Sequence, residues 1–213
     1  MSIDDAAIRA WMRAYAGEIA AHREQLIRLD SAIGDGDHGA NMDRGMKKAV
    51  ERLDGLGEGD IGATLKAVGM ALVSSVGGAA GPLYGTLFMQ MGTKTTGVSE
   101  LDLQGWADAL EAGVRGVQAR GKAEPGDKTM VDALLPAVDA LRQAAADGAD
   151  LPDALQRSAA AAQEGMEATI PLVARKGRAS YLGERSAGHQ DPGATSSHLL
   201  LKAAADALGS QDS

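Results

Sequence analysis

The 213-residue sequence contains no cysteine, and this absence excludes disulfide bridges, thiolate metal sites and cysteine nucleophiles. Aromatic residues are also scarce, at 3% of the chain, whereas hydrophobic residues make up 45%. A core built mainly from alanine, leucine, valine and methionine follows, and such side chains suit closely packed helices. The lack of cysteine also fits the cytoplasmic location that we expect.

The sequence likewise lacks long apolar runs and an excess of basic charge. No run approaches the ~18 residues expected for a membrane span, and the first five residues do not resemble a signal peptide. The net charge of −8 gives no general attraction to nucleic acid. We therefore expect neither a membrane nor a nucleic acid as a partner, and a polyphosphate ligand would need cations supplied at its own site.

Apolar side chains recur at steps of three and four, which is typical of amphipathic helices. The first helix is expected over residues 8–29, and a second from about Asn41. Asp60 and Asp102 each precede a further apolar repeat and are expected helix N-caps, and Asp150 opens another helix.

The later part of the chain follows the same pattern. We expect a helix that includes Val131, and another that reaches residue 173 after a proline near its first turn. Residues 182–193 form a loop rich in glycine and charge, and a final helix follows Thr195. No clear strand pattern and no linker appear. The sequence therefore predicts one all-α domain over residues 1–213, with about eight helices and with its polar residues concentrated in the loops.

Three aspartates, Asp30, Asp35 and Asp37, fall within eight residues and are separated by glycines. Offsets of five and two fit neither the helix nor the strand period, so a loop is needed to gather the three carboxylates. A like-charge pair about 4 Å apart costs roughly 4 kcal/mol at an effective dielectric near 20, so the cluster needs a proton or a cation. Hard divalent cations prefer oxygen ligands, and we interpret the segment as a magnesium–nucleotide site.

Other interpretations of this segment are weaker or remain open. Aspartate and glycine also favour turns and helix ends. An EF-hand does not fit, because counting from Asp35 puts Gly39 and Ala40 at its fifth and sixth positions. An aspartyl-phosphate site would follow an apolar strand, whereas a helix is expected here. His38 is either a surface or capping residue or a phosphate or metal contact, and Asn41 either caps a helix or begins one that faces a phosphate.

Three further motifs each have a structural and a functional interpretation. The glycine run 77–82 is either a helix break or a close backbone approach, and it is not a Walker A loop. In segment 126–132, Met130 is either core or an apolar surface for an adenine ring. The basic group 175–178 is either solvated or faces phosphate oxygens.

Together these motifs resemble the DhaL family, the nucleotide-binding subunits of dihydroxyacetone kinase. The resemblance runs from about Asp30 to Ser197 and rests on Asp30, Ile33–Met42, Gly77–Gly85, Gly126–Leu134, Arg175–Gly183 and Ser186–Ala194. It implies a barrel of eight antiparallel helices with the nucleotide at one end, which agrees with the helical pattern.

The resemblance also implies roles for individual residues. Asp30, Asp35 and Asp37 would hold two Mg²⁺ ions against the phosphates of ADP or ATP, with Arg178 as a further catalytic residue. The implied nucleotide contacts are His38, Gly39, Ala40, Asn41, Ala79, Ala80, Gly121, Thr129, Met130, Arg178, Asp191, Pro192 and Gly193. Relatives often carry serine at the position of Ala80, and the missing hydroxyl removes one contact worth about 1.5–3 kcal/mol to a charged oxygen.

The implied reaction is phosphoryl transfer, in which positioning and charge neutralisation dominate. A DhaK-like partner would bind dihydroxyacetone covalently, and a DhaM-like protein of the phosphotransferase system would rephosphorylate the bound ADP. Two alternatives remain open: an ATP-dependent version acting on dihydroxyacetone or another small ketose, and a non-catalytic nucleotide sensor. The sequence also leaves a homodimer open.

Overall fold

The computed structural model describes residues 2–57 and 59–209. The helices in these residues are α1 (Asp5–Ala21), α2 (Arg23–Ile33), α3 (His38–Asp54), α4 (Ile61–Ser75), α5 (Ala80–Lys94), α6 (Leu103–Gly121), α7 (Val131–Ala146), α8 (Leu151–Ala168), the 3₁₀ helix η1 (Arg178–Ser186) and α9 (Pro192–Leu208). Two short strands, β1 (Ile3–Asp4) and β2 (Glu100–Leu101), pair antiparallel.

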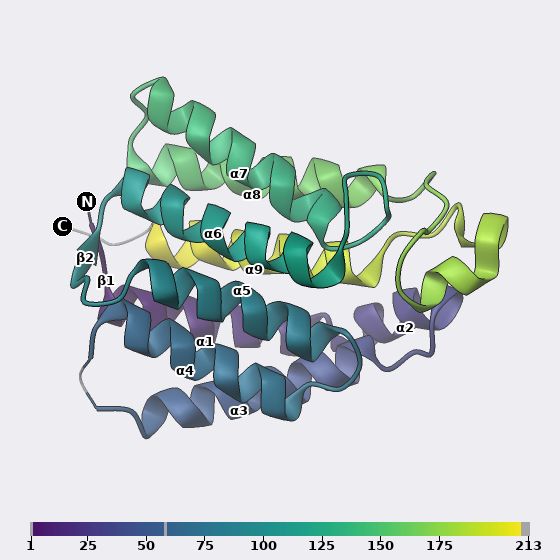
Figure 1. Ribbon diagram of the computed structural model, residues 1–213, viewed down its shortest axis with the longest axis horizontal. Helices are drawn as coiled ribbons and strands as arrows, with labels where there is room; N and C mark the ends of the chain where they lie inside the picture. The colour runs from purple at the N-terminus through teal and green to yellow at the C-terminus, as the bar shows by residue number, and fades with distance from the viewer. Residues whose placement is uncertain (1, 58, 210–213) are drawn as a thin grey trace.

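Eight of these helices, α1 and α3 to α9, are 15–19 residues long and form a closed ring (Figure 1). Each packs against the next one in the ring, and α9 closes the ring by packing against α1. The short α2 continues from α1 and packs against α3, α9 and η1. The predicted all-α barrel of about eight antiparallel helices is confirmed, and no helix among the described residues is long and apolar enough to cross a membrane.

The ring is filled by a single large cluster of buried side chains to which all nine α-helices contribute. Trp11 of α1 is completely buried in this cluster and packs edge-on against Trp106, with 5.0 Å between the ring centroids, and beside Phe88 at 5.8 Å. The indole Nε1 of Trp11 donates a hydrogen bond to the Leu200 carbonyl oxygen at 3.0 Å. The few aromatic residues therefore tie helices from distant parts of the chain together.

Helix α8 lies so close to α7 that glycine is required at their contact. A Cβ atom at Gly165 would lie 2.1 Å from the carbonyl oxygen of Asp132, which is shorter than any real carbon–oxygen contact. Asp132 stands in the first turn of α7, at the end of the ring that carries the α6–α7 loop. The position of this loop therefore depends on a residue without a side chain in the neighbouring helix.

Three predicted helix starts are confirmed together with their capping residues. Asp60, Asp102 and Asp150 are N-caps, and their side chains accept hydrogen bonds from the backbone N–H groups of Ala63, Gly105 and Asp153. Helix α5 begins within the glycine run, at Ala80, and Pro152 lies in the first turn of α8 as expected.

Several predicted boundaries were wrong. The helix expected over 8–29 breaks at His22, where the ring Nδ1 lies 2.9 Å from the Glu18 carbonyl oxygen that the backbone N–H also uses. Helix α8 ends at Ala168 rather than reaching 173, because the Thr169 hydroxyl turns back to the Met166 carbonyl.

The remaining differences concern helix starts and short elements. The second helix begins at His38, not at Asn41, with Asp37 as its N-cap residue. The last helix begins at Pro192, because Asp191 caps it by accepting from the Ala194 N–H at 2.7 Å. The loop expected over 182–193 includes part of η1, and the two strands were not predicted.

Candidate functional site

The loops at one end of the ring surround a cavity of about 420 Å³, which is in the range of small-molecule sites. Most of the residues predicted for the site line it, although they come from six separate segments of the chain. These residues are Asp30, Asp35, Asp37, His38, Asn41, Ala79, Ala80, Gly121, Thr129, Met130, Arg178, Asp191, Pro192 and Gly193. The fold therefore brings together motifs that the sequence separates by more than 160 positions.

Gly39 and Ala40 are the two predicted residues that do not line this cavity. Gly39 is buried against α2, where a Cβ atom would lie 2.3 Å from the Arg23 carbonyl oxygen. Its lack of a side chain thus allows α3 to begin directly against α2.

The three aspartates approach one another at one side of the cavity. Asp30 stands in the last turn of α2, Asp35 in the connection and Asp37 at the N-cap of α3, so a helix end contributes to the cluster that we expected from a loop alone. One carboxylate oxygen from each lies within 4.8 Å of the others. Opposite ligands of one Mg²⁺ ion are about 4.2 Å apart, so a small movement of these side chains is enough for the three oxygens to share one ion.

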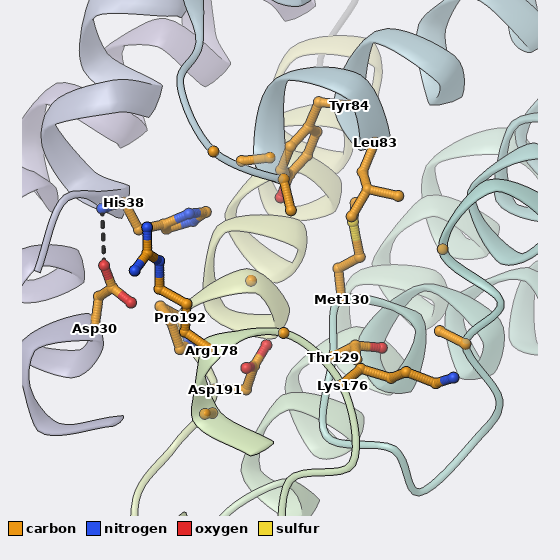
Figure 2. A pocket seen from close by; sticks show the side chains of 18 of the residues that line it. Asp30, His38, Leu83, Tyr84, Thr129, Met130, Lys176, Arg178, Asp191 and Pro192 are labelled. Carbon is orange, nitrogen blue, oxygen red and sulfur yellow. Dashed lines mark hydrogen bonds between the residues drawn. The ribbon is translucent and has the colours of Figure 1, made fainter. Parts of the chain in front are cut away.

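The backbone around the cluster is shaped for these carboxylates. A Cβ atom at Gly34 would lie 2.2 Å from Asp30 Oδ1, and Gly36 has a left-handed φ of 75°. The backbone N–H of His38 donates to Asp30 Oδ2 at 3.0 Å, as Figure 2 shows. Burial raises the pKa of the Asp30 carboxyl, and the nearby negative charges of Asp35 and Asp37 add to this effect. The cluster is therefore an electrostatically costly arrangement that a cation would relieve.

One basic residue faces the aspartates, and two others line the cavity elsewhere. Nε of Arg178, at the start of η1, lies 2.9 Å from Asp35 Oδ2 in an ion pair. Lys176 and Arg120 also line the cavity. The guanidinium of Arg178 suits phosphate oxygens as well as a carboxylate.

The opposite side of the cavity is apolar. Leu83, Val117, Ala123 and Met130 line it, and Figure 2 shows Leu83 and Met130 together on the side away from Asp30. Met130 is only 4% exposed, so it belongs to the core and to the cavity wall at once. A polarizable apolar wall of this kind fits the flat face of a nucleobase.

A buried polar network lies behind the aspartates. The Ser196 Oγ lies 2.9 Å from His38 Nε2 and 2.7 Å from the Tyr84 hydroxyl, and the Tyr15 hydroxyl donates to the Ser196 carbonyl oxygen. Burial lowers the pKa of His38 to about 4, so its imidazole is neutral at pH 7. The imidazole ring of His38 is therefore held by Ser196 of α9, whereas the backbone N–H of His38 donates a hydrogen bond to Asp30.

Asp132 organises the loop between α6 and α7. Its carboxylate accepts hydrogen bonds from the N–H groups of Gly126 at 2.5 Å and Thr129 at 2.7 Å. Sequence reasoning gave no role to Asp132, to Lys128 or to Arg120. For Asp132 the available signal was a charge between the apolar residues Val131 and Ala133, whereas Lys128, between Asp127 and Thr129, carried none.

The pH dependence of stability is expected to change in the Asp191→Asn variant. Burial and the charge of Asp132 raise the pKa of Asp191 to about 7, whereas an unfolded aspartate titrates near 3.9. The folded state thus binds this proton more tightly, and the Asp191 contribution to stability falls as pH rises from about 4 to 7. Asparagine keeps the helix cap and removes this loss. Urea unfolding at several pH values should show the stability of the variant, relative to wild type, rising by at least about 1 kcal/mol over this range; a constant difference would contradict the shifted pKa.

Comparison with known proteins shows which family this chain resembles. The family model of the DAK2 domain matches residues 32–206. The Escherichia coli (strain K12) PEP-dependent dihydroxyacetone kinase, ADP-binding subunit DhaL, is 46% identical over 202 residues, which are 95% of this chain and 96% of the relative. A more distant relative, L-erythrulose 1-kinase of Mycolicibacterium smegmatis, is 38% identical over 89% of this chain and 33% of its own length.

A solved structure also resembles the fold. The dihydroxyacetone kinase of C. freundii in complex with AMP-PNP and Mg²⁺ superposes with a TM-score of 0.73 at 27% identity. The match covers 97% of this chain, which spans about a third (34%) of the solved chain.

An all-α barrel with an acidic, basic and apolar cavity at one end is thus the architecture of a nucleotide-dependent kinase domain. This chain belongs to the DAK2 domain family and, within it, to the DhaL group of ADP-binding subunits. The family predicted from the five motifs is confirmed.

Proposed function

We propose that this chain is the nucleotide-binding subunit of a dihydroxyacetone kinase, which holds magnesium with ADP or ATP and transfers a phosphoryl group to dihydroxyacetone on a DhaK-like partner. The observation that carries the proposal is the convergence of three aspartates with Arg178 at one side of a cavity whose other side is apolar. This arrangement suits a polyphosphate with a base attached. The similarity to DhaL subunits and to a kinase solved with AMP-PNP and Mg²⁺ supports it.

In this proposal Asp30, Asp35 and Asp37 hold two magnesium ions, which would neutralise the phosphate charge. Arg178 leaves Asp35 to face the phosphates and stabilises the negative charge of the transferred group. The start of α3 around Asn41 and the turn 79–80 bind phosphate oxygens through backbone N–H groups.

The nucleoside is bound on the other side of the cavity. Gly121, Thr129 and Met130 lie against the base and sugar, while the start of α9 at 191–193 closes the cavity floor. The start of that helix is buried and fixed by its Asp191 cap, which accepts from the Ala194 N–H, and a rigid cavity floor favours tight retention of the nucleotide.

The phosphoryl donor that we favour is a DhaM-like protein that rephosphorylates bound ADP, because the Escherichia coli relative is PEP-dependent. A second candidate is an ATP-dependent kinase acting on another small ketose, since a family relative is an L-erythrulose kinase. A non-catalytic sensor and a homodimer remain further alternatives. We propose that the complex acts in the cytoplasm.

A reconstitution experiment separates these alternatives. The protein is purified, passed through gel filtration and tested for retained ADP, then mixed with a DhaK partner, dihydroxyacetone and either phosphorylated DhaM or ATP. We expect retained ADP and triose phosphate formation with phosphorylated DhaM. Product with ATP alone would favour the ATP-dependent version, erythrulose turnover would identify another acceptor, and binding without product under any condition would favour the sensor.

A further inference from the structure

Lys128, in the loop before α7, is a buried lysine whose ammonium group is surrounded by backbone carbonyl oxygens. The residue is 1% exposed. Nζ donates to the carbonyl oxygens of His189 at 2.5 Å, Ser186 at 2.7 Å, Leu172 at 3.0 Å and Ile170 at 3.4 Å. Burial of an ammonium is costly unless its donors are satisfied, and here backbone oxygens satisfy them.

The four acceptors lie near the two ends of one segment, residues 170–189, which carries Lys176, Arg178 and η1. The ammonium therefore holds the two ends of this segment together. We call this set of hydrogen bonds from Lys128 Nζ to the four carbonyl oxygens the staple. The segment has other restraints as well: a small apolar cluster in which Ile33 meets Ala174 and Ala179, with Leu182 packed against it, and the Arg178–Asp35 ion pair. The Ala174 N–H donates to the Ser186 hydroxyl at 2.8 Å, and the Gly188 N–H donates to the Ile170 carbonyl oxygen at 2.7 Å.

The staple also joins this segment to the loop that lines the nucleoside side of the cavity. Lys128 directly precedes Thr129 and Met130, and it has a left-handed backbone with φ 62°. The backbone N–H of Arg175 donates to the Asp127 carbonyl oxygen at 3.1 Å, which gives a second link between the same two loops. One buried cation thus fixes the apolar and the basic walls of the cavity relative to each other.

We propose that Lys128 is a positioning residue, whose ammonium sets the place of Arg178 over the aspartate cluster by holding the base of the 170–189 segment. The inference rests on the proposed nucleotide site for its functional consequence. The carbonyl cage itself does not depend on that proposal. Charge-assisted hydrogen bonds are stronger than neutral ones, so the cage requires a cation at this position and not only a side chain of similar length.

The test compares Lys128→Met, which keeps the side-chain length and removes the charge, with Lys66→Met at the other end of the ring, where Nζ bonds the exposed Thr96 hydroxyl. Hydrogen exchange of the intact protein without nucleotide should become at least about tenfold faster over residues 170–189 in Lys128→Met, while the barrel helices stay protected. Lys128→Gly, which adopts the left-handed backbone readily, should give the same result. Unchanged exchange in both variants would overturn the staple.

A double-mutant cycle then tests the positioning role. Lys128→Met should weaken magnesium–ADP binding about tenfold in the wild-type background, but by less than about twofold when Arg178→Ala is already present, because the staple acts through Arg178. An equal loss of ADP affinity in both backgrounds would overturn the positioning role. The weaker binding would then result from a general loss of stability. Absence of ADP binding by the wild-type protein would instead refute the proposed function. The hydrogen-exchange experiment would still show whether Lys128 restrains residues 170–189.

Discussion

The Asp35→Asn variant is expected to lose magnesium-dependent ADP binding by at least about 100-fold, since even outer-shell partners of a metal site contribute 10–100-fold. The amide has the shape of the carboxylate but no charge, so one of three anionic oxygens is removed from the cation site. Arg178 also loses its partner at 2.9 Å. Isothermal titration with ADP, with and without magnesium chloride, measures the change.

The fold should not suffer from this substitution. Asp35 is exposed, and its removal relieves repulsion within the cluster, so the free energy of unfolding should change by less than about 0.5 kcal/mol. Asp54→Asn provides a matched control, because Asp54 is also exposed and paired with an arginine, Arg13, but lies at the far end of α3. ADP affinity close to wild type in Asp35→Asn would refute the metal assignment.

The Gly165→Ala variant is expected to be the most destabilising single-methyl change, at about 2–3 kcal/mol. The added carbon would meet the Asp132 carbonyl oxygen at 2.1 Å, and a backbone atom in a helix has little room to retreat. Because the Asp132 carboxylate holds Gly126 and Thr129, the same clash should also displace the loop at the nucleoside side of the cavity. Urea unfolding and ADP titration should therefore both show a loss.

A helical glycine elsewhere in the chain gives the matched control. Gly17 in α1 is exposed, and a Cβ atom added there would have no other atom within 4 Å. Gly17→Ala should therefore stabilise the protein by about 0.5–1 kcal/mol through helix propensity. If Gly165→Ala were as stable as Gly17→Ala, the close approach of α7 and α8 would not limit this position.

The helical barrel was predictable because its signals are local. The apolar repeats and the caps at Asp60, Asp102 and Asp150 are each contained within a few residues, and all three caps are observed. The break at His22 was not predictable in this way, because the apolar repeat continues through it while the helix does not. The pairing of β1 with β2 depends on two residues meeting two others nearly a hundred positions away.

In the site, too, the residues with local sequence signals were predictable and those held by long-range contacts were not. The aspartates and glycines near residue 35 are recognisable by composition, and the cavity gathers them with the other predicted motifs. Lys128 gives no such signal, since its partners are carbonyl oxygens, which every residue carries and no sequence distinguishes. The nucleotide contacts assigned to single residues stay predictions until a bound nucleotide is observed.

The antiparallel ring has a consequence for how the barrel combines with other proteins. The first turn of α1 and the last turn of α9 lie side by side at the end of the ring opposite the cavity (Figure 1). A polypeptide tethered through either helix would therefore leave the mouth of the cavity uncovered. The barrel is thus suited to modular fusion and to circular permutation: joining the two neighbouring ends and opening the chain at the turn between α7 and α8, which does not line the cavity, would preserve every wall of the cavity.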